Sequence, residues 1–189
     1  RRLCERNRYT GTKIRRESRR APGTILNGKW KILKHMGSGG KGDVYVASQK
    51  ILNRNVAVKV FSPGLEGVES FIQEEMKVER ERFRREIVAM AGIRHPNVIH
   101  IYDHGDDSQL GRKLEFLVME LVSGSTLRSS MPSQGFGFDR VETVKWIQTF
   151  FLPTLEGMKA VHNAGIIHRD IKPENILLDG LIPKIADFG

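Results

Sequence analysis

Hydrophobic and polar residues alternate along several short stretches of the chain. The clearest is Val56–Phe61, where a valine occupies every second position, so Ala57 and Lys59 share the other face of the predicted strand. β-Branched and aromatic residues predict further strands near residues 30–36, 44–47, 98–102 and 114–122. A polar turn at residues 105–113 is expected to join the last two.

Two stretches have helical periodicity instead. Residues 68–91 are dense in Glu, Lys and Arg, and Glu86 shares an apolar stripe there with Phe83 and Met90. A second helix is expected to begin near Asp139 as N-cap and to be kinked or interrupted at Pro153. Apolar residues at three- and four-residue steps predict its core-facing stripe: Val144, Ile147, Phe151, Leu155, Met158 and Val161.

Composition narrows the class of protein. The chain has 189 residues, 39% of them hydrophobic and 28% charged, which is typical of a soluble globular protein. Its single cysteine, Cys4, excludes an internal disulfide framework, and no apolar run reaches the ~18 residues of a membrane span. We therefore expect a cytoplasmic protein, with a membrane tether elsewhere in a longer chain as the alternative.

Positive charge is concentrated at the start. Residues 1–20 hold nine Lys or Arg and two Glu, a net charge of +7 out of +9 for the whole chain. Such a segment attracts nucleic acid or anionic lipid, but a solvated, disordered tail over residues 1–23 is the favoured interpretation. Because there is no initiating Met, we expect the true N-terminus to lie upstream.

A glycine-rich segment, Gly37–Gly42, separates the first two predicted strands. Glycines let backbone N–H groups approach a phosphate without obstruction by a Cβ atom. A dinucleotide-binding unit needs a helix after its glycines, whereas a strand follows here, and a P-loop needs Lys where Asp43 stands. On the strand at Val56–Phe61, the small Ala57 leaves room for a flat base, and the cationic Lys59 can contact a polyphosphate.

The most informative stretch is His168–Asn175, which reads His-Arg-Asp-Ile-Lys-Pro-Glu-Asn. Asp170 can accept a proton, and Lys172 can stabilise negative charge beside it. Asn175 and Asp187, the latter within Asp-Phe-Gly, offer the hard oxygen ligands that Mg²⁺ prefers. Asp179-Gly180 predicts a hairpin between them.

In this order the segments resemble the catalytic domain of serine/threonine protein kinases, particularly bacterial ones. The resemblance covers about residues 23–189 and implies an α+β, two-lobed fold. The N-lobe, at residues 24–121, would hold a five-stranded antiparallel sheet and one helix. Residues 122–189 would form the hinge and the first part of a helical C-lobe. A domain truncated at the Asp-Phe-Gly motif, without its activation segment, is expected.

The resemblance also implies a site for ATP with Mg²⁺, or with Mn²⁺ as the alternative, and a protein substrate that presents Ser or Thr. Asp170 would accept the proton of the substrate hydroxyl, and Lys172 would balance charge. Lys59, held by Glu86, would orient the phosphates.

Asn175 and Asp187 would hold the metal. Met119 would be the gatekeeper, and the backbone of Glu120 and Val122 would bind adenine. The other expected nucleotide contacts are Gly37, Ser38, Gly39, Gly40, Gly42, Val44, Ala57 and Leu177.

Two expectations concern how the helix at residues 68–91 is coupled to the site. Met90, Ile101, His168 and Phe188 would form a packing column. Arg169, which in relatives pairs with a phosphorylated activation segment, is expected to have no partner in this chain.

Three alternatives remain. A nucleotide-binding pseudokinase or scaffold is supported only by the truncation. A small-molecule kinase usually lacks the equivalents of Lys172 and Pro173. A nucleic-acid binder would depend on the basic tail. We expect the 189-residue chain to bind nucleotide but to be a weak catalyst, and nothing in the sequence indicates its oligomeric state.

Overall fold

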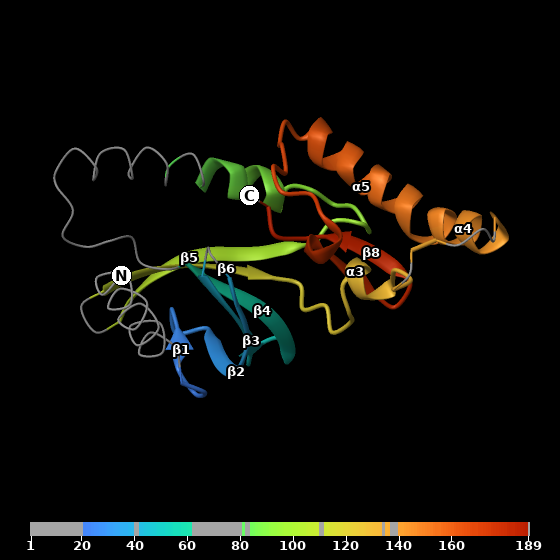
Figure 1. The fold of residues 1–189 in the computed structure, drawn as a ribbon. Helices are drawn as coiled ribbons and strands as arrows, with labels where there is room; N and C mark the ends of the chain where they lie inside the picture. Colours follow the sequence, from blue (N-terminus) through green and yellow to red (C-terminus); the bar gives the residue numbers. More distant parts are fainter. Residues whose placement is uncertain are drawn as a thin grey trace, which may run out of the picture. The chain divides into compact units, whose positions relative to one another are not determined.

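The computed structural model describes residues 21–188 except 40–41, 62–80, 82–83, 110–111, 134 and 137–139 (Figure 1). Residues 1–20 of the predicted tail, with Cys4, as well as Gly40, Asp139 and most of the helix expected at residues 68–91 therefore lie outside the described residues. No helix in the described part is long and apolar enough to cross a membrane.

The chain divides into two compact units. The first falls within Arg1–Pro63 and Gly105–Leu117, and the second within Gly64–His104 and Val118–Gly189. This grouping places residues 64–104 with the later part of the chain, whereas the predicted lobes divide after residue 121. The lobe boundaries stay a prediction.

Six strands form one sheet, in the order β1-β2-β3-β4-β6-β5. Their bounds are Ile25–Leu26, Trp30–Gly39, Gly42–Gln49, Arg54–Phe61, Ile101–Gln109 and Arg112–Met119, for β1 to β6. The prediction of five strands was wrong by one, because the two-residue β1 pairs antiparallel with β2 and buries Leu26. β2, β3 and β4 form an antiparallel meander, and the strand predicted at Val56–Phe61 is confirmed as β4.

Two boundaries differ from those predicted. β2 continues through the glycines as far as Gly39, and β5 and β6 include polar residues expected to form a turn. Ladder pairing satisfies backbone groups whatever the side chains, so polarity alone did not end these strands. Gly105 is required within β5, because an added Cβ would lie 2.9 Å from the ring of Phe116.

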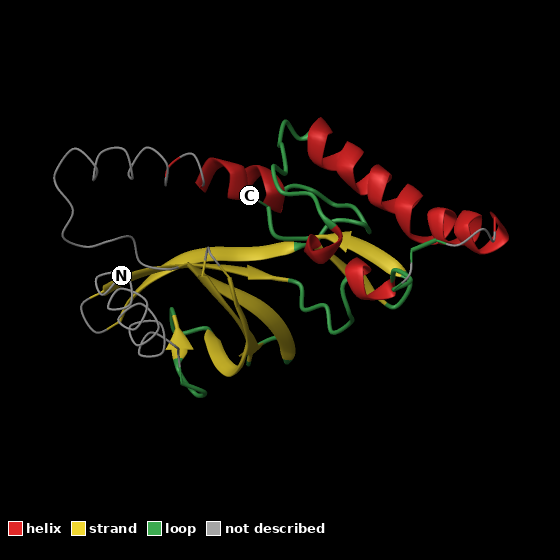
Figure 2. Cartoon of the chain, in the orientation of Figure 1, coloured by secondary structure: helices red, strands yellow, loops and turns green. Residues whose placement is uncertain are grey.

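In the second unit, helical residues 84–91 precede α3 (Leu127–Ser130), α4 (Arg140–Trp146) and α5 (Leu152–Asn163). A π-helical turn, Ile147–Phe151, joins α4 to α5 just before Pro153, so the predicted interruption is confirmed. The proline has no N–H to donate to the preceding turn, and the widened turn accommodates it. Figure 2 shows α4, this turn and α5 following one another along one line.

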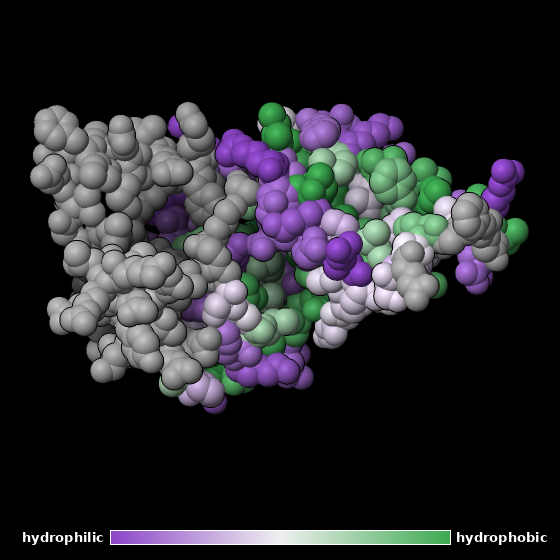
Figure 3. Space-filling model, in the orientation of Figure 1, coloured by the Kyte–Doolittle hydropathy of each residue, from purple (hydrophilic) through white to green (hydrophobic). Residues whose placement is uncertain are grey.

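The apolar stripe predicted for this helix is mostly exposed, which corrects the expectation that it packs in the core. Val144, Phe151 and Leu155 are each about half exposed, and hydrophobic side chains are visible over α5 in Figure 3. The buried face of α5 is formed by Thr154 and Gly157 together with Val161, the one buried member of the predicted stripe. An added Cβ at Gly157 would lie 2.7 Å from the Asn97 carbonyl oxygen, so this face allows a close approach of backbone.

The chain ends in the predicted hairpin, β7 (Ile176–Asp179) and β8 (Ile182–Ile185), with Gly180 at a positive φ of 61°. β8 packs against α5 and forms a parallel bridge with Val98. Asn97 also anchors it, since its Nδ2 donates to the Pro183 carbonyl over 2.9 Å. This hairpin carries the residues that precede Asp187.

Candidate active site

The loop at residues 168–175 brings together the polar side chains that the sequence indicated. Lys172 Nζ donates to Asp170 Oδ2 over 2.7 Å, and Asn175 Nδ2 donates to the same oxygen over 3.0 Å. Asn175 Nδ2 also lies 2.8 Å from the Asp170 carbonyl oxygen, so one amide closes the loop. Two donors thus orient the Asp170 carboxylate, which is 49% exposed and open to a reacting group.

The charge of Lys172 is maintained by this arrangement. Its hydrogen bond to Asp170 raises the pKa of Lys172 above the usual value, and the charges of Asp170, Glu174 and Asp187 act in the same direction. An ordinary lysine already titrates near pH ~10.4, so Lys172 stays cationic throughout the neutral range. Asp170 therefore has a fixed positive charge beside it.

Buried His168 ties this loop to the segment that carries Asp187. Its Nε2 lies 2.9 Å from the Ala186 carbonyl oxygen, and because a carbonyl only accepts, Nε2 is the donor. The other ring nitrogen, Nδ1, then accepts from the Asp170 N–H over 3.4 Å. The Ala186 N–H in turn donates to the Asn175 carbonyl over 2.9 Å.

Two residues at this site adopt unusual backbone conformations. Arg169 has a φ of 65° and Asp187 a φ of 61°, in the left-handed region that few non-glycine residues occupy. Such conformations persist only where the surrounding hydrogen bonds and packing hold them, and they are common at functional sites.

The oxygen atoms at this site match the chemistry of Mg²⁺. Both hydrogen bonds of the Asn175 side chain use its amide nitrogen, which leaves its amide oxygen available to a cation. Asp187 follows directly after Ala186, whose N–H is bonded to the Asn175 carbonyl. An amide oxygen and a carboxylate from adjacent backbone suit a hard cation that retains several waters.

Met119, Glu120 and Val122, the residues predicted at the adenine site, lie close to the same segment. The Glu120 N–H donates to the His100 carbonyl over 2.8 Å, so the Glu120 group left for the predicted adenine contact is its carbonyl. Val122 is buried in a cluster with Ile99 and Ala186, and Met119, Leu177 and Phe188 pack against this cluster. Met119, the predicted gatekeeper, and Leu177, another predicted nucleotide contact, therefore pack against the same apolar cluster.

The first unit carries the glycine hairpin and Lys59. Val44 pairs with Lys59 across β3 and β4, and Ala57 lies two residues from Lys59 along β4. Paired residues and those two apart project from the same side of a sheet. The predicted adenine contacts Val44 and Ala57 thus share one face with Lys59, whose Nζ lies 6.0 Å from the centre of the Phe61 ring.

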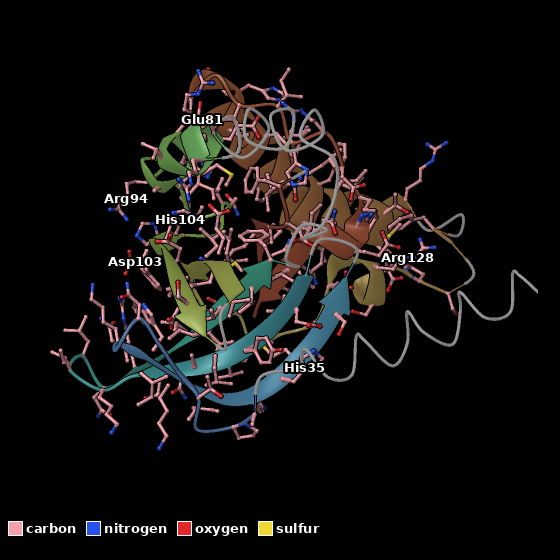
Figure 4. All side chains as sticks on the ribbon, turned by 90° about the vertical axis from the view of Figure 1, so that its left-hand side faces the viewer. His35, Glu81, Arg94, Asp103, His104 and Arg128 are labelled. Carbon is pink, nitrogen blue, oxygen red and sulfur yellow. The ribbon has the colours of Figure 1, made fainter. Side chains whose placement is uncertain are left out.

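A polar contact that the sequence did not indicate closes the glycine hairpin. The Ser38 hydroxyl donates to Asp43 Oδ1 over 2.5 Å, and His35 Nε2 lies 3.3 Å from the same oxygen. Figure 4 labels His35 on its strand. Below this contact, an added Cβ at Gly42 would lie 2.1 Å from the Val60 carbonyl oxygen, so only glycine fits there. Asp43, where a P-loop has its lysine, therefore stabilises the hairpin.

Comparison with known families decides the identity of the fold. The family model described as "Protein kinase domain" matches residues 30–189. The chain belongs to the protein kinase family. The resemblance drawn from the sequence motifs is thereby confirmed.

Curated bacterial relatives are named as serine/threonine protein kinases. The chain is 39% identical over 176 residues to the "probable serine/threonine-protein kinase pknA2" of Bifidobacterium longum, a match that covers 91% of this chain and 21% of that protein. It is 34% identical over 169 residues to the "serine/threonine-protein kinase PrkC" of Bacillus subtilis, covering 88% and 23%. The chain thus spans between a fifth and a quarter of the length of these relatives.

Solved structures share the protein kinase fold. The Mycobacterium tuberculosis PknI kinase domain aligns with a TM-score of 0.66 and 24% identity, over 90% of this chain and 62% of that one. The structure titled "PpkA-294 apo form" aligns with a TM-score of 0.69, also at 24% identity and with the same coverage. The predicted α+β kinase fold is confirmed.

Within this kinase chain, Glu86 has a partner that the sequence did not predict. Its Oε1 lies 2.7 Å from Arg169 Nη2, in an ion pair in which 26% of the Glu86 side chain is exposed. The expectation that Arg169 would have no partner was therefore wrong. Lys59 and Glu86 belong to different units, and the ion pair expected between them stays a prediction.

The packing column expected in the kinase is confirmed at one of its contacts. The rings of His168 and Phe188 lie 4.7 Å apart, centre to centre, at 42°. Met90 and Ile101 are both buried.

The structure also shows that Gly124 supports the strand that follows the catalytic loop. Gly124, just after the hinge, approaches β7 so closely that an added Cβ would lie 1.7 Å from the Leu178 carbonyl oxygen. The next residue, Ser125, accepts the Leu178 N–H over 2.8 Å.

Proposed function

We propose that the chain forms the nucleotide-binding and phosphoryl-transfer site of a signalling serine/threonine protein kinase. The observation that supports this most strongly is the Asp170 carboxylate, held by Lys172 and Asn175 yet half exposed. Phosphoryl transfer depends mainly on positioning and on electrostatic stabilisation, and this loop provides both.

In this proposal Asp170 accepts the proton of the substrate hydroxyl. The distances support that role, because the carboxylate is fixed by two donors and cannot rotate without losing them. Lys172, cationic at neutral pH, stabilises negative charge that develops on the transferred group. The protein substrate presents Ser or Thr, in keeping with the names of the curated relatives.

Asn175 and Asp187 would hold Mg²⁺, with Mn²⁺ as the alternative, and the ion would neutralise phosphate charge when bound. Val44, Ala57 and Lys59 would meet the nucleotide from the first unit. Their shared face on β3 and β4 supports this assignment.

We further propose that the 189-residue chain binds nucleotide and turns it over slowly, since it covers 62% of the solved kinase domain of PknI. A nucleotide-binding pseudokinase or scaffold is the alternative. A cytoplasmic location for these two units is part of the proposal.

Calorimetric titration with MgATP tests nucleotide binding. We expect saturable binding by the wild-type chain and binding at least about tenfold weaker in Asp187→Asn, which loses a charged ligand of the metal. Asp179→Asn is the matched control, because this exposed aspartate lies in the same hairpin region and is predicted to leave affinity unchanged. Equal affinities in all three proteins would contradict the proposed metal site.

A further inference from the structure

The second unit contains an open pocket, lined by both polar and apolar residues, whose side chains the proposed function does not use. Its volume is about 340 Å³, within the range of small-molecule sites. The lining comes from three separate segments, all within this unit: Ile93, Arg94, His95, Val98, His100 and Tyr102, then Glu120, then Lys184.

The one acid in the lining is already neutralised. Glu120 Oε1 lies 2.8 Å from Lys184 Nζ, and both side chains are largely buried, at 21% and 11% exposure. The second oxygen of Glu120 accepts the His100 N–H over 3.3 Å. Among the residues that line the cavity, Arg94 is therefore the formal charge without a counter-charge.

Arg94 is placed to receive an anion. Its Nη1 lies 2.8 Å from His100 Nδ1 and also contacts Nε2, so the guanidinium rests against the imidazole. A guanidinium only donates, and its five N–H groups form a planar fork that fits a phosphate or a carboxylate. Figure 4 shows the Arg94 side chain directed outward from the ribbon, and the residue is exposed.

The remaining walls suit a flat apolar group. The rings of His100 and Tyr102 meet edge to face, with centres 4.9 Å apart at 87°. Ile93 and Val98, which also line the cavity, are buried. Aromatic walls over an aliphatic floor favour a ring, and few precisely placed polar groups then fix its orientation.

We propose that this cavity binds a small aromatic anion, an aryl phosphate or an aryl carboxylate. The anionic group contacts Arg94, and the ring lies against His100, Tyr102 and the aliphatic floor. The proposal does not depend on nucleotide binding, since no lining side chain is assigned to the ATP site.

Phenyl phosphate is the probe, with inorganic phosphate and phenol as its two halves. Titrated into the wild-type chain and followed by ¹H–¹⁵N and methyl NMR, phenyl phosphate should give saturable shifts at Ile93, Val98 and His100. We expect its affinity to exceed that of either half by at least about tenfold, because each half loses one set of contacts.

Arg94→Gln should weaken phenyl phosphate binding about tenfold, the effect of one charge-assisted contact. Arg128→Gln is the matched control. It also removes one positive charge, but Arg128 lies on α3, pairs with Glu174 at 3.5 Å and does not line the cavity. The affinity of Arg94→Gln for phenyl phosphate should therefore be about tenfold lower than that of Arg128→Gln.

Equal loss in the two variants would reduce the effect to general electrostatics and overturn the proposal. Shifts that are absent, or that centre on Met119, Val122 and Asp187 and disappear when MgATP is added, would overturn it too, by placing the probe in the nucleotide site. Absence of MgATP binding with intact phenyl phosphate binding would contradict the proposed function alone.

Discussion

The catalytic loop and the helical residues 84–91 each carry an acid that the sequence assigned to the active site, but the two acids are held differently. Asp170 is bonded by Lys172 and Asn175, both within five residues of it. Glu86 is bonded by Arg169, which is 83 residues away. Short-range contacts follow from spacing in the chain, whereas the partner of a distant acid depends on how separate elements are placed.

The catalytic loop contributes a residue to both of these contacts. Asp170 and Arg169 are neighbours, yet the left-handed backbone at Arg169 directs the two side chains to different partners. The loop is fixed underneath by buried His168 and by the close approach of Gly124 to β7. The Glu86–Arg169 pair is partly exposed and depends on two flexible side chains. We therefore expect substitutions at Gly124 and His168 to reduce stability strongly, and substitutions at the Glu86–Arg169 pair to reduce it only slightly.

The largest effect on stability is expected for Gly124→Ala. The new Cβ would lie 1.7 Å from the Leu178 carbonyl oxygen, so β7 must shift, at a cost of ~3 kcal/mol in the free energy of unfolding. Gly37→Ala is the control, because nothing lies within 4 Å of its added Cβ. Urea unfolding of both variants measures the difference. Equal stability would mean that the loop does not depend on this contact.

A smaller effect is expected for His168→Leu. The leucine fills the buried site but leaves the Ala186 carbonyl and the Asp170 N–H without their ring partners, which costs ~2 kcal/mol. Affinity for MgATP should also fall, since Asp187 follows Ala186. His162→Leu, at an exposed position near the end of α5, should change neither quantity. A His168→Leu variant with wild-type stability and wild-type affinity for MgATP would show that His168 does not hold the loop in place.

The smallest effect is expected at the ion pair of Glu86 with Arg169. A double-mutant cycle of Glu86→Gln and Arg169→Gln should give a coupling of ~0.5 kcal/mol that decreases as salt is added, because partly exposed pairs are weak and screened. The cycle cancels the separate effect of each substitution. A coupling above ~2 kcal/mol that is insensitive to salt would show that this pair is as firmly held as the catalytic loop.

The sequence predicted those parts of the molecule in which chemistry and spacing are local. The strand at Val56–Phe61, the hairpin at Asp179-Gly180, the interruption at Pro153 and the Asp170–Asn175 grouping all follow from near neighbours. The family was recognisable for the same reason, because the motifs are short and each carries its own chemistry.

The errors arose where distant backbone approaches decide the structure. The buried face of α5 uses Thr154 and Gly157, which hydrophobic periodicity does not register, and so the apolar stripe through Val144 was assigned to the wrong face. The Ser38–Asp43 contact and the Glu86–Arg169 pair involve polar residues with many potential partners. The spacing of these residues along the chain does not determine which partner each one contacts.

ADP release from MgATP, with and without a generic Ser/Thr-rich protein substrate, measures directly whether Asp170 is the proton acceptor. We expect slow release by the wild-type chain, loss of roughly 10²–10⁴-fold in Asp170→Asn, and an unchanged rate in Asp179→Asn. Equal release by the wild-type chain and Asp170→Asn, or none by the wild-type chain, would contradict the assignment of Asp170 as the proton acceptor.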